Sequence, residues 1–504
     1  AIVIGVAALF ARAEFGTAPG EPEARSSLSF WTFLLAVWAA LNAAFLGADL
    51  FTLFVAVELL TFAAGPLVSL GGSAATLQAA LRYLLFALLG SVLYLLGVGL
   101  LYGGYGTLDI ALLARRVRPE PVAFAAAALM TAGLLAKTAL FPLHLWLPPA
   151  HAGAPPAASA VLSALVVKGS FFLIFRLWFG ALPALRTPAA MQVLAALGAA
   201  AILFGSVLAL RQQRLKLLVA YSTVAQIGYL FLMFPLVGAT PLTSSAWTGG
   251  VLQAVSHAFA KAAMFLSAGL LAKALGHDRI AGLVGVGRVL PMSIFAFGLG
   301  GLSLMGLPPS GGFVAKWLLL RASIETGQWW WSLVIVTGGL FTGGYVYRVL
   351  APALRRAGPP PVPCAPISRA REALVLVLAL LSVAIGLLPL TSFSLRRACD
   401  VACTRGSGSR HCPGSPRRCS RSTRRRWCST RIGCASRSRS SRPERRCSAL
   451  RRCSGRWPAH THANGCKAPR TPPNSRSGGC SPWRAASPSS SPQTCSRSTP
   501  RTRW

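Results

Sequence analysis

The sequence predicts an all-α polytopic membrane protein, and three features of its composition support that class. Of its 504 residues, 54% are hydrophobic and only 12% are charged, whereas soluble domains carry about 25% charged residues. The apolar residues fall in runs of roughly 20, the length that a helix needs to cross about 30 Å of hydrocarbon. The 13 Trp and 25 Phe suit a bilayer and its interfaces. We therefore exclude a soluble enzyme and expect a multi-pass protein of the cell inner (plasma) membrane, in contact with the lipid bilayer.

The first 29 residues begin inside an apolar run, AIVIGVAALF, without an initiating Met. A secretory signal peptide shows a basic segment before its apolar run and a small-residue cleavage site after it. Neither can be located here. We therefore interpret residues 1–29 as a truncated N-terminal helix and a loop.

Eleven full apolar spans follow, which with the partial first helix gives a bundle of about 11–12 transmembrane helices. Their approximate limits are 30–47, 49–70, 81–102, 122–147, 158–180, 190–210, 217–237, 247–273, 289–321, 331–350 and 372–391. Two of the spans are long and are interrupted by proline, at Pro142 in one and at Pro308 and Pro309 in the other. Proline removes a backbone donor and clashes with the preceding turn, so each span is expected to be a discontinuous helix.

The two interrupted spans also predict how the chain is organised. Breaks at corresponding places in two halves of a transporter are typical of inverted structural repeats with ion sites near the bilayer midplane. We expect a first repeat over residues 30–180 and a second over 190–350. Residues 351–395 would then form a loop and the last transmembrane helix.

The tail at 396–504 has a different composition from the rest of the chain. Residues 399–504 hold 24 of the 50 Lys and Arg and 11 of the 12 Cys, without an apolar period. Such a segment cannot build a core and is expected to be disordered. Its cysteines lack the paired spacing of a zinc site. We interpret the tail as non-native, for instance as a shifted reading frame, and expect no nucleic-acid partner. The alternative is a genuine basic arm that binds anionic lipid or nucleic acid.

Ionisable residues inside the apolar spans are the candidate functional residues. A charge at the bilayer centre costs on the order of 3 kcal/mol, so such a group is interpreted as functional by default. The candidates are Glu58, Lys137, Lys168, His257, Lys261 and Lys316. Two of them, His257 and Lys261, are spaced i and i+4 and share a helix face.

Each candidate also has a structural interpretation. Lys168 could extend to an interface, Glu58 could only neutralise a lysine, and His257 could be a hydrogen-bonded core residue. We interpret His144, Trp146 and His151, in a proline-rich loop, as positional rather than catalytic residues. The chemistry that the amines, the imidazole and the carboxylate share is proton binding and release, so together they are typical of a proton relay.

Four stretches of the sequence resemble a known family. They are GADLFTLFVAVELL, KTALFPLHLWLPPAHAGAPPAASAVLSALVVKGSFFLIFR, HAFAKAAMFLSAG and GLSLMGLPPSGGFVAKWLLL. They resemble the proton-translocating membrane subunits shared by NADH:quinone oxidoreductase (respiratory complex I, N and M types) and Mrp-type cation/proton antiporters (the D-type subunit).

The resemblance implies a bundle with two inverted five-helix repeats, each containing one broken helix. It implies that Glu58 and Lys137 pair in a first half-channel. Further residues form a polar axis along the midplane, namely Lys168, His257 and Lys261. The resemblance assigns Lys316 to a second half-channel.

The branch of the family is left open by the motifs. GADLFTLFVAVELL looks most like the D-type subunit of the antiporter, whereas KLLVAYSTVAQIGYL is closer to N-type subunits, which often have His where Gln226 stands. Lys316 argues against the M type, which usually has Glu there. The family's usual Pro-Asp-Ala-His is Pro-Pro-Ala-His here, ending at His151, so its Asp is absent or moved.

We therefore expect an ion-translocating subunit of a multisubunit membrane complex. Its partners are other membrane subunits and protons, with Na⁺ or K⁺ as candidates for exchange. We expect no cofactor, no metal site and no redox-active residues on this chain, so that any oxidoreductase activity would belong to the assembled complex. The alternative is an independent secondary transporter that binds an organic anion at its midplane lysines.

Overall fold

The computed structural model describes residues 1–16, 24–238, 244–356 and 361–388. The chain divides into two units, Ala1–His411 and Cys412–Trp504, and all the described residues lie in the first. The predicted tail at 396–504 lies outside the described residues. The α-helices are α1 Ile2–Phe15, α2 Arg25–Leu46, α3 Leu50–Ser69, α4 Ala74–Tyr105, α5 Ile110–Arg116, α6 Pro121–Thr138, α7 Leu147–Gly153, α8 Pro156–Val161, α9 Val167–Arg176, α10 Pro188–Arg211, α11 Leu215–Phe231, α12 Met233–Leu236, α13 Ser245–Leu275, α14 Pro291–Met305, α15 Gly311–Glu325, α16 Trp330–Leu354 and α17 Arg369–Ala384.

The predicted class, an all-α polytopic membrane protein, is confirmed. Within the described residues the backbone forms helices and turns, apart from two isolated β-bridges. Ten helical segments are long and apolar enough to cross a membrane. These ten correspond to ten of the eleven predicted spans. At the remaining span, predicted at 289–321, the structure has two shorter helices, α14 and α15.

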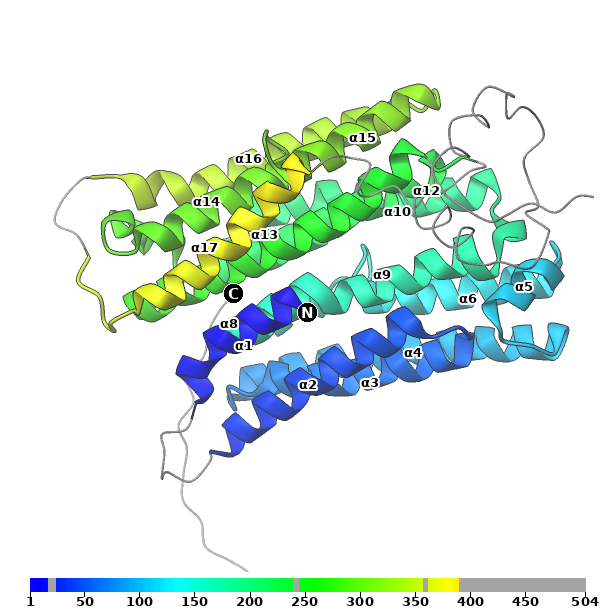
Figure 1. The fold of residues 1–504 in the computed structure, drawn as a ribbon, viewed down its shortest axis with the longest axis horizontal. Helices are drawn as coiled ribbons and strands as arrows, with labels where there is room; N and C mark the ends of the chain where they lie inside the picture. The colour runs from blue at the N-terminus through cyan, green and yellow to red at the C-terminus, as the bar shows by residue number, and fades with distance from the viewer. Residues whose placement is uncertain (17–23, 239–243, 357–360, 389–504) are drawn as a thin grey trace, which may run out of the picture. The chain divides into compact units, whose positions relative to one another are not determined.

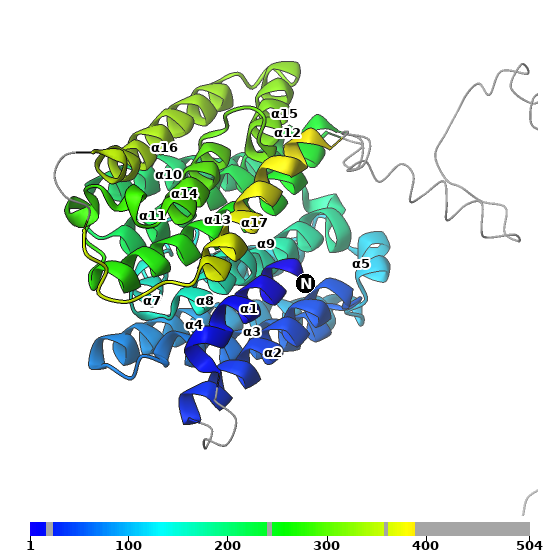
Figure 2. The same cartoon turned by 60° about the vertical axis from the view of Figure 1, so that its left-hand side comes forward.

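The helices of this unit lie side by side (Figure 1), with α2, α3 and α4 along one edge and α14, α15 and α16 along the opposite edge. Between them run α9, α10 and α13. The turned view in Figure 2 keeps α1 beside α2 and α17 beside α13 and α14. Helix α13 has 31 residues, so it is about 46 Å long and exceeds the thickness of the hydrocarbon layer.

Glycines allow two helix pairs to approach closely. A Cβ atom on Gly133 of α6 would lie 2.2 Å from the carbonyl oxygen of Gly90 on α4. Likewise, a Cβ atom on Gly228 of α11 would lie 2.3 Å from the carbonyl oxygen of Gly198 on α10. Small residues at such positions let backbones meet inside membranes, where packing replaces the hydrophobic effect as the driving force. The α4–α6 contact brings together the residues around Lys137.

The first predicted break is a helix end followed by a loop. Helix α6 stops at Thr138, because Ala139 takes a left-handed conformation with φ 57°. Pro142 lies in the turns between α6 and α7, four residues after the helix has ended. The indole N–H of Trp146 donates to the carbonyl of Ala136 at 2.9 Å. The Ala136 carbonyl at the end of α6 therefore accepts from a side chain as well as from the Ala139 N–H.

The second break separates α14 from α15. Gly306 ends α14 with φ 89°, and the Ser310 hydroxyl begins α15 by accepting from the Phe313 N–H at 3.2 Å. Pro308 and Pro309 lie between the two helices. A Cβ atom on Gly312 would lie 1.8 Å from the Ser303 carbonyl oxygen. Glycine is therefore required where the start of α15 crosses α14.

The start of α3 is fixed by Asp49, the N-cap residue. Its carboxylate accepts hydrogen bonds from the backbone of Phe51 and Thr52 and from the Thr52 hydroxyl. Burial raises the pKa of the Asp49 carboxyl, but these hydrogen bonds outweigh burial and hold the pKa below its usual value. Asp49 also forms a β-bridge with Asp109, the N-cap of α5. These contacts set the position of α3, which carries Glu58.

Candidate functional site: a row of buried charged residues

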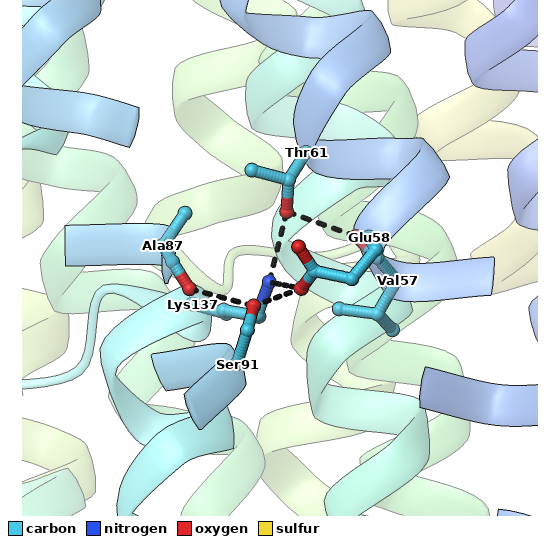
Figure 3. A network of polar contacts seen from close by, with 6 residues as sticks. All are labelled: Val57, Glu58, Thr61, Ala87, Ser91 and Lys137. Atoms are coloured by element: carbon cyan, nitrogen blue, oxygen red, sulfur yellow. Dashed lines mark hydrogen bonds and ion pairs between the residues drawn. The ribbon is translucent and has the colours of Figure 1, made fainter. Parts of the chain in front are cut away.

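Glu58 and Lys137 form an ion pair between α3 and α6 (Figure 3). The Lys137 Nζ atom lies 2.8 Å from Glu58 Oε1 and donates to the Thr61 hydroxyl at 2.9 Å. The Ser91 hydroxyl on α4 also donates to the Glu58 carboxylate. The two charged side chains are 5% and 16% exposed. A buried charge is stable only when it is paired and hydrogen-bonded, and three helices supply the required groups here.

Lys137 is the next-to-last residue of α6, directly before the first break. The Thr138 hydroxyl donates back to the Leu134 carbonyl at 2.7 Å, and Trp146 donates to Ala136. These contacts fix the last turn of α6 and hence the position of the amine. The positional role of Trp146 stays a prediction, to which this contact adds a geometric basis.

Lys168 and Lys261 are connected through hydroxyl and backbone carbonyl groups near the centre of the bundle. Lys168 donates to the Ser163 carbonyl at 2.5 Å, and the Ser163 hydroxyl lies 2.9 Å from that of Thr223. Thr223 donates to the Val219 carbonyl at 3.0 Å, which also accepts from Lys261 at 2.9 Å. A continuous set of hydrogen-bonding residues thus joins the Lys168 amine on α9 to the Lys261 amine on α13, through the π-helical turn at Leu162–Val166 and through α11.

The connecting hydroxyls were missed by the sequence analysis. Ser163, Ser222 and Thr223 are fully buried, and Ser222 is a further acceptor for the Lys261 amine. The signal that could have found them is their position inside spans that are otherwise apolar. A serine in a helix can satisfy itself on the preceding turn, however, so residue type alone does not identify a contact between helices.

His257 lies one helical turn before Lys261 on α13 and is 2% exposed. Among the described residues, neither of its ring nitrogens has a hydrogen-bond partner. His151, predicted in a loop, lies instead on α7. It is also buried, and its ring stacks on Phe265 at 4.6 Å. His144 packs against Phe141 and Phe204.

Lys316 lies on α15, five residues after the start of that helix. Its Nζ atom donates to the carbonyls of Leu304 at 2.5 Å and Met305 at 3.3 Å, which the second break has freed. It also lies 4.1 Å from the centre of the Tyr229 ring. A cation over an aromatic face is stabilised by about 0.5 to 2 kcal/mol, most when it is desolvated.

The buried amines differ in charge balance. Within the described part of the chain, Lys137 has a carboxylate within 4.0 Å, whereas Lys168, Lys261 and Lys316 bind carbonyls and hydroxyls. No group of three or more His, Cys, Asp or Glu in that part is placed to hold a metal ion. The arrangement can bind and release protons at separate positions along the bundle.

A multi-pass bundle with buried amines beside two helix breaks defines a class of ion-translocating membrane proteins. Residues 47–342 match the family described as NADH:quinone oxidoreductase/Mrp antiporter, transmembrane region. This match covers more than half of the chain. The chain belongs to this family, and the resemblance found in its motifs is confirmed.

Relatives come from both branches. The chain is 37% identical to the N-type subunit of NADH-quinone oxidoreductase from Desulforudis audaxviator, over 67% of each chain. It is 31% identical to the D-type subunit of the Na(+)/H(+) antiporter from Alkalihalophilus pseudofirmus, over 68% of each. The chain thus spans about two thirds of the length of these relatives.

Solved structures give the same two branches. A chain of the Mrp complex from a Dietzia species superposes with a TM-score of 0.69 at 27% identity, covering 78% of this chain and 80% of that one. A chain of respiratory complex I from Thermus thermophilus superposes with a TM-score of 0.61 at 26% identity, and the match covers 78% of this chain and 84% of that one.

Proposed function

We propose that this chain translocates protons across the plasma membrane as one subunit of a multisubunit complex. The observation that carries the proposal is the series of buried basic groups with polar contacts between helices. Glu58 and Lys137 form the group at one edge, Lys168, His257 and Lys261 the central group, and Lys316 the group at the other edge. The relatives named above, a complex I subunit and an antiporter subunit, support this proposal.

The proton is the ion that suits these residues. Amines and an imidazole bind and release H⁺, and a protonated amine repels a metal cation. A site for Na⁺ or K⁺ would instead need several oxygen ligands and negative charge. If a cation is exchanged, we propose that its path lies beside this row or on another subunit. Redox chemistry, where the complex has it, belongs to other subunits.

The alternative, an independent transporter of organic anions, is supported less well. A substrate site needs its cationic groups to converge on one point, but the amines here bind different partners. Lys168 lines a cavity of about 560 Å³ whose other side chains are apolar or aromatic. Lys316 lines a different cavity, of about 300 Å³.

Transport by the assembled complex in inside-out membrane vesicles tests the proposal. Proton movement is followed with a pH-sensitive dye, and the amount of complex by co-purification of its subunits. Lys137→Ala and Lys316→Ala should each lower the rate per complex by about 100-fold or more, the range of a lost proton-transfer group. Lys273→Ala is the matched control, because Lys273 is an exposed lysine in the last turn of α13. Wild-type transport in either relay variant refutes the proposal. Anion uptake by the purified chain alone in liposomes supports the alternative.

A further inference from the structure

Two buried glutamines lie between the central group and Lys316. Gln253 is on α13, four residues before His257 and eight before Lys261, so all three share one face of that helix. The Gln253 amide donates to Gln226 Oε1 on α11 at 3.2 Å. Both glutamine side chains are buried, with 1% and 0% exposure. Neither belongs to the row of buried charged residues.

Gln226 continues the connection to the second break. Its amide nitrogen donates to the Leu304 carbonyl at 3.1 Å and to the Thr342 hydroxyl at 3.2 Å. The Leu304 carbonyl is also the closest acceptor of Lys316, at 2.5 Å. A carbonyl oxygen has two lone pairs and can accept both bonds. The two glutamines therefore tie α13 to the group that holds the Lys316 amine.

A carboxamide can donate and accept hydrogen bonds, but unlike an amine or an imidazole it does not take up a proton near neutral pH. The proton cannot be stored on Gln226 or Gln253. Within the described residues, the Gln253 Oε1 atom and both ring nitrogens of His257 are buried and have no protein partner. Buried polar atoms in such positions usually bond ordered water.

We propose that Gln226 and Gln253 are positioning residues of the transport path. They orient the water that carries a proton between the central group and Lys316, and they hold the Leu304 carbonyl at the Lys316 amine. This inference rests on the proposed function, because it assigns the amides to a step between two groups of the same relay.

The surrounding contacts fix the amide pair in place. The Thr342 hydroxyl donates to the Gly338 carbonyl at 2.7 Å, so its oxygen is oriented to accept from Gln226. The Tyr229 hydroxyl donates to the Ile335 carbonyl at 3.2 Å, which holds the ring beneath Lys316. The Leu304 carbonyl and the Tyr229 ring beside Lys316 are thus held by contacts with neighbouring helices, and removing one amide should disturb the amine without unpacking the bundle.

The test compares Gln226→Leu and Gln253→Leu with a matched control in the assembled complex. Gln192→Leu is the control, because Gln192 forms an amide pair of the same kind with Gln328 at 2.7 Å, away from the relay. We expect Gln226→Leu and Gln253→Leu each to transport about tenfold more slowly per complex, and Gln192→Leu to match the wild type. The ratio of the rate in H₂O to the rate in D₂O should be larger in both variants than in the wild type. Loss of stability alone would lower the amount of complex and leave this solvent isotope ratio unchanged.

Gln226→Asn is the conservative variant, since it retains a carboxamide, and it should keep more of the rate than Gln226→Leu. Wild-type rates and isotope effects in both Gln226→Leu and Gln253→Leu overturn the inference. Equal losses in Gln192→Leu also overturn it. If Lys316→Ala abolishes transport while the glutamine variants are normal, this inference fails and the proposed function stands. If Lys316→Ala is itself normal, the proposed function fails.

Discussion

Lys137 and Lys316 lie beside the two helix breaks, but their surroundings differ in charge. Lys137 is paired with the Glu58 carboxylate at 2.8 Å and with the Thr61 hydroxyl. Lys316 is held by two backbone carbonyls and by the face of the Tyr229 ring. The first amine is neutralised by an anion, whereas the second is stabilised by dipoles and a quadrupole.

This difference in charge balance predicts that the two ends of the proposed relay respond differently to a nearby charge. A protonated Lys137 belongs to a neutral pair, so it adds no net charge to the bundle. A protonated Lys316 leaves a net positive charge in a low-dielectric region, where charges interact strongly. A second positive charge arriving nearby is therefore more costly at Lys316 than at Lys137.

Among the variants that test this comparison, Glu58→Gln is expected to lower transport most. It removes the carboxylate beside Lys137, so that the first amine, like Lys316, has no anionic partner among the described residues. Breaking a buried pair by removing one partner costs about 3 to 5 kcal/mol, part of which the retained Thr61 contact offsets. We expect proton transport per complex to fall by about 10- to 100-fold. A normal rate would reduce Glu58 to a structural counter-ion.

The geometry of the first site can be disturbed without touching its charges. Gly133→Ala places a methyl group where the Gly90 carbonyl now lies, so α4 and α6 must separate. We expect the free energy of unfolding to fall by about 1 to 3 kcal/mol and transport to fall by about tenfold. Gly99→Ala on α4 is the control, because nothing lies within 4 Å of that site. Thermal unfolding in detergent that leaves Gly133→Ala as stable as Gly99→Ala would contradict the close contact.

A smaller effect is expected at the second site from the loss of the aromatic ring. Tyr229→Leu removes the cation–π contact with Lys316 and should slow transport about fivefold. Tyr229→Phe keeps the ring and loses only the bond to the Ile335 carbonyl, so its rate should stay near the wild type. Equal losses in the two variants would assign the effect to the hydroxyl instead.

The smallest of these effects is expected at His257, between the two sites. Its ring makes no protein hydrogen bond among the described residues, and a water molecule can occupy part of its volume in His257→Gln. We expect transport to fall only about threefold. Complete loss would show that the imidazole itself carries the proton, and the second site would then depend on it as the first depends on Glu58.

Much of the fold followed from the sequence because its signals are local. Apolar runs gave the membrane spans, and proline with glycine gave the neighbourhoods of both breaks. The position of the first helix end did not follow, since α6 ends at Thr138, before the left-handed Ala139, rather than at Pro142. An alanine with positive φ is rare, and the residue type alone does not predict this conformation. The two inverted repeats, over 30–180 and 190–350, stay a prediction.

The candidate site was only partly accessible from the sequence. An isolated ionisable residue in an apolar run is visible, so the six candidate residues could be named. The partners of Lys316 are two backbone carbonyls and an aromatic ring from other helices, and such groups carry no signature in the sequence. Gln226 and Gln253 were overlooked as a pair for the same reason, because their contact joins α11 to α13 and depends on how those helices pack.

The length and continuity of α13 have a mechanical consequence. Gln253, His257 and Lys261 are attached to one unbroken helix, so a sliding or turning movement of that helix displaces all three together. The bond of Lys261 to Ser222 and the bond of Gln253 to Gln226 would then change in the same movement. Lys137 and Lys316 lie next to breaks and can shift separately. The three residues at the centre of the bundle are therefore expected to move together, whereas Lys137 and Lys316 can move independently of them and of each other.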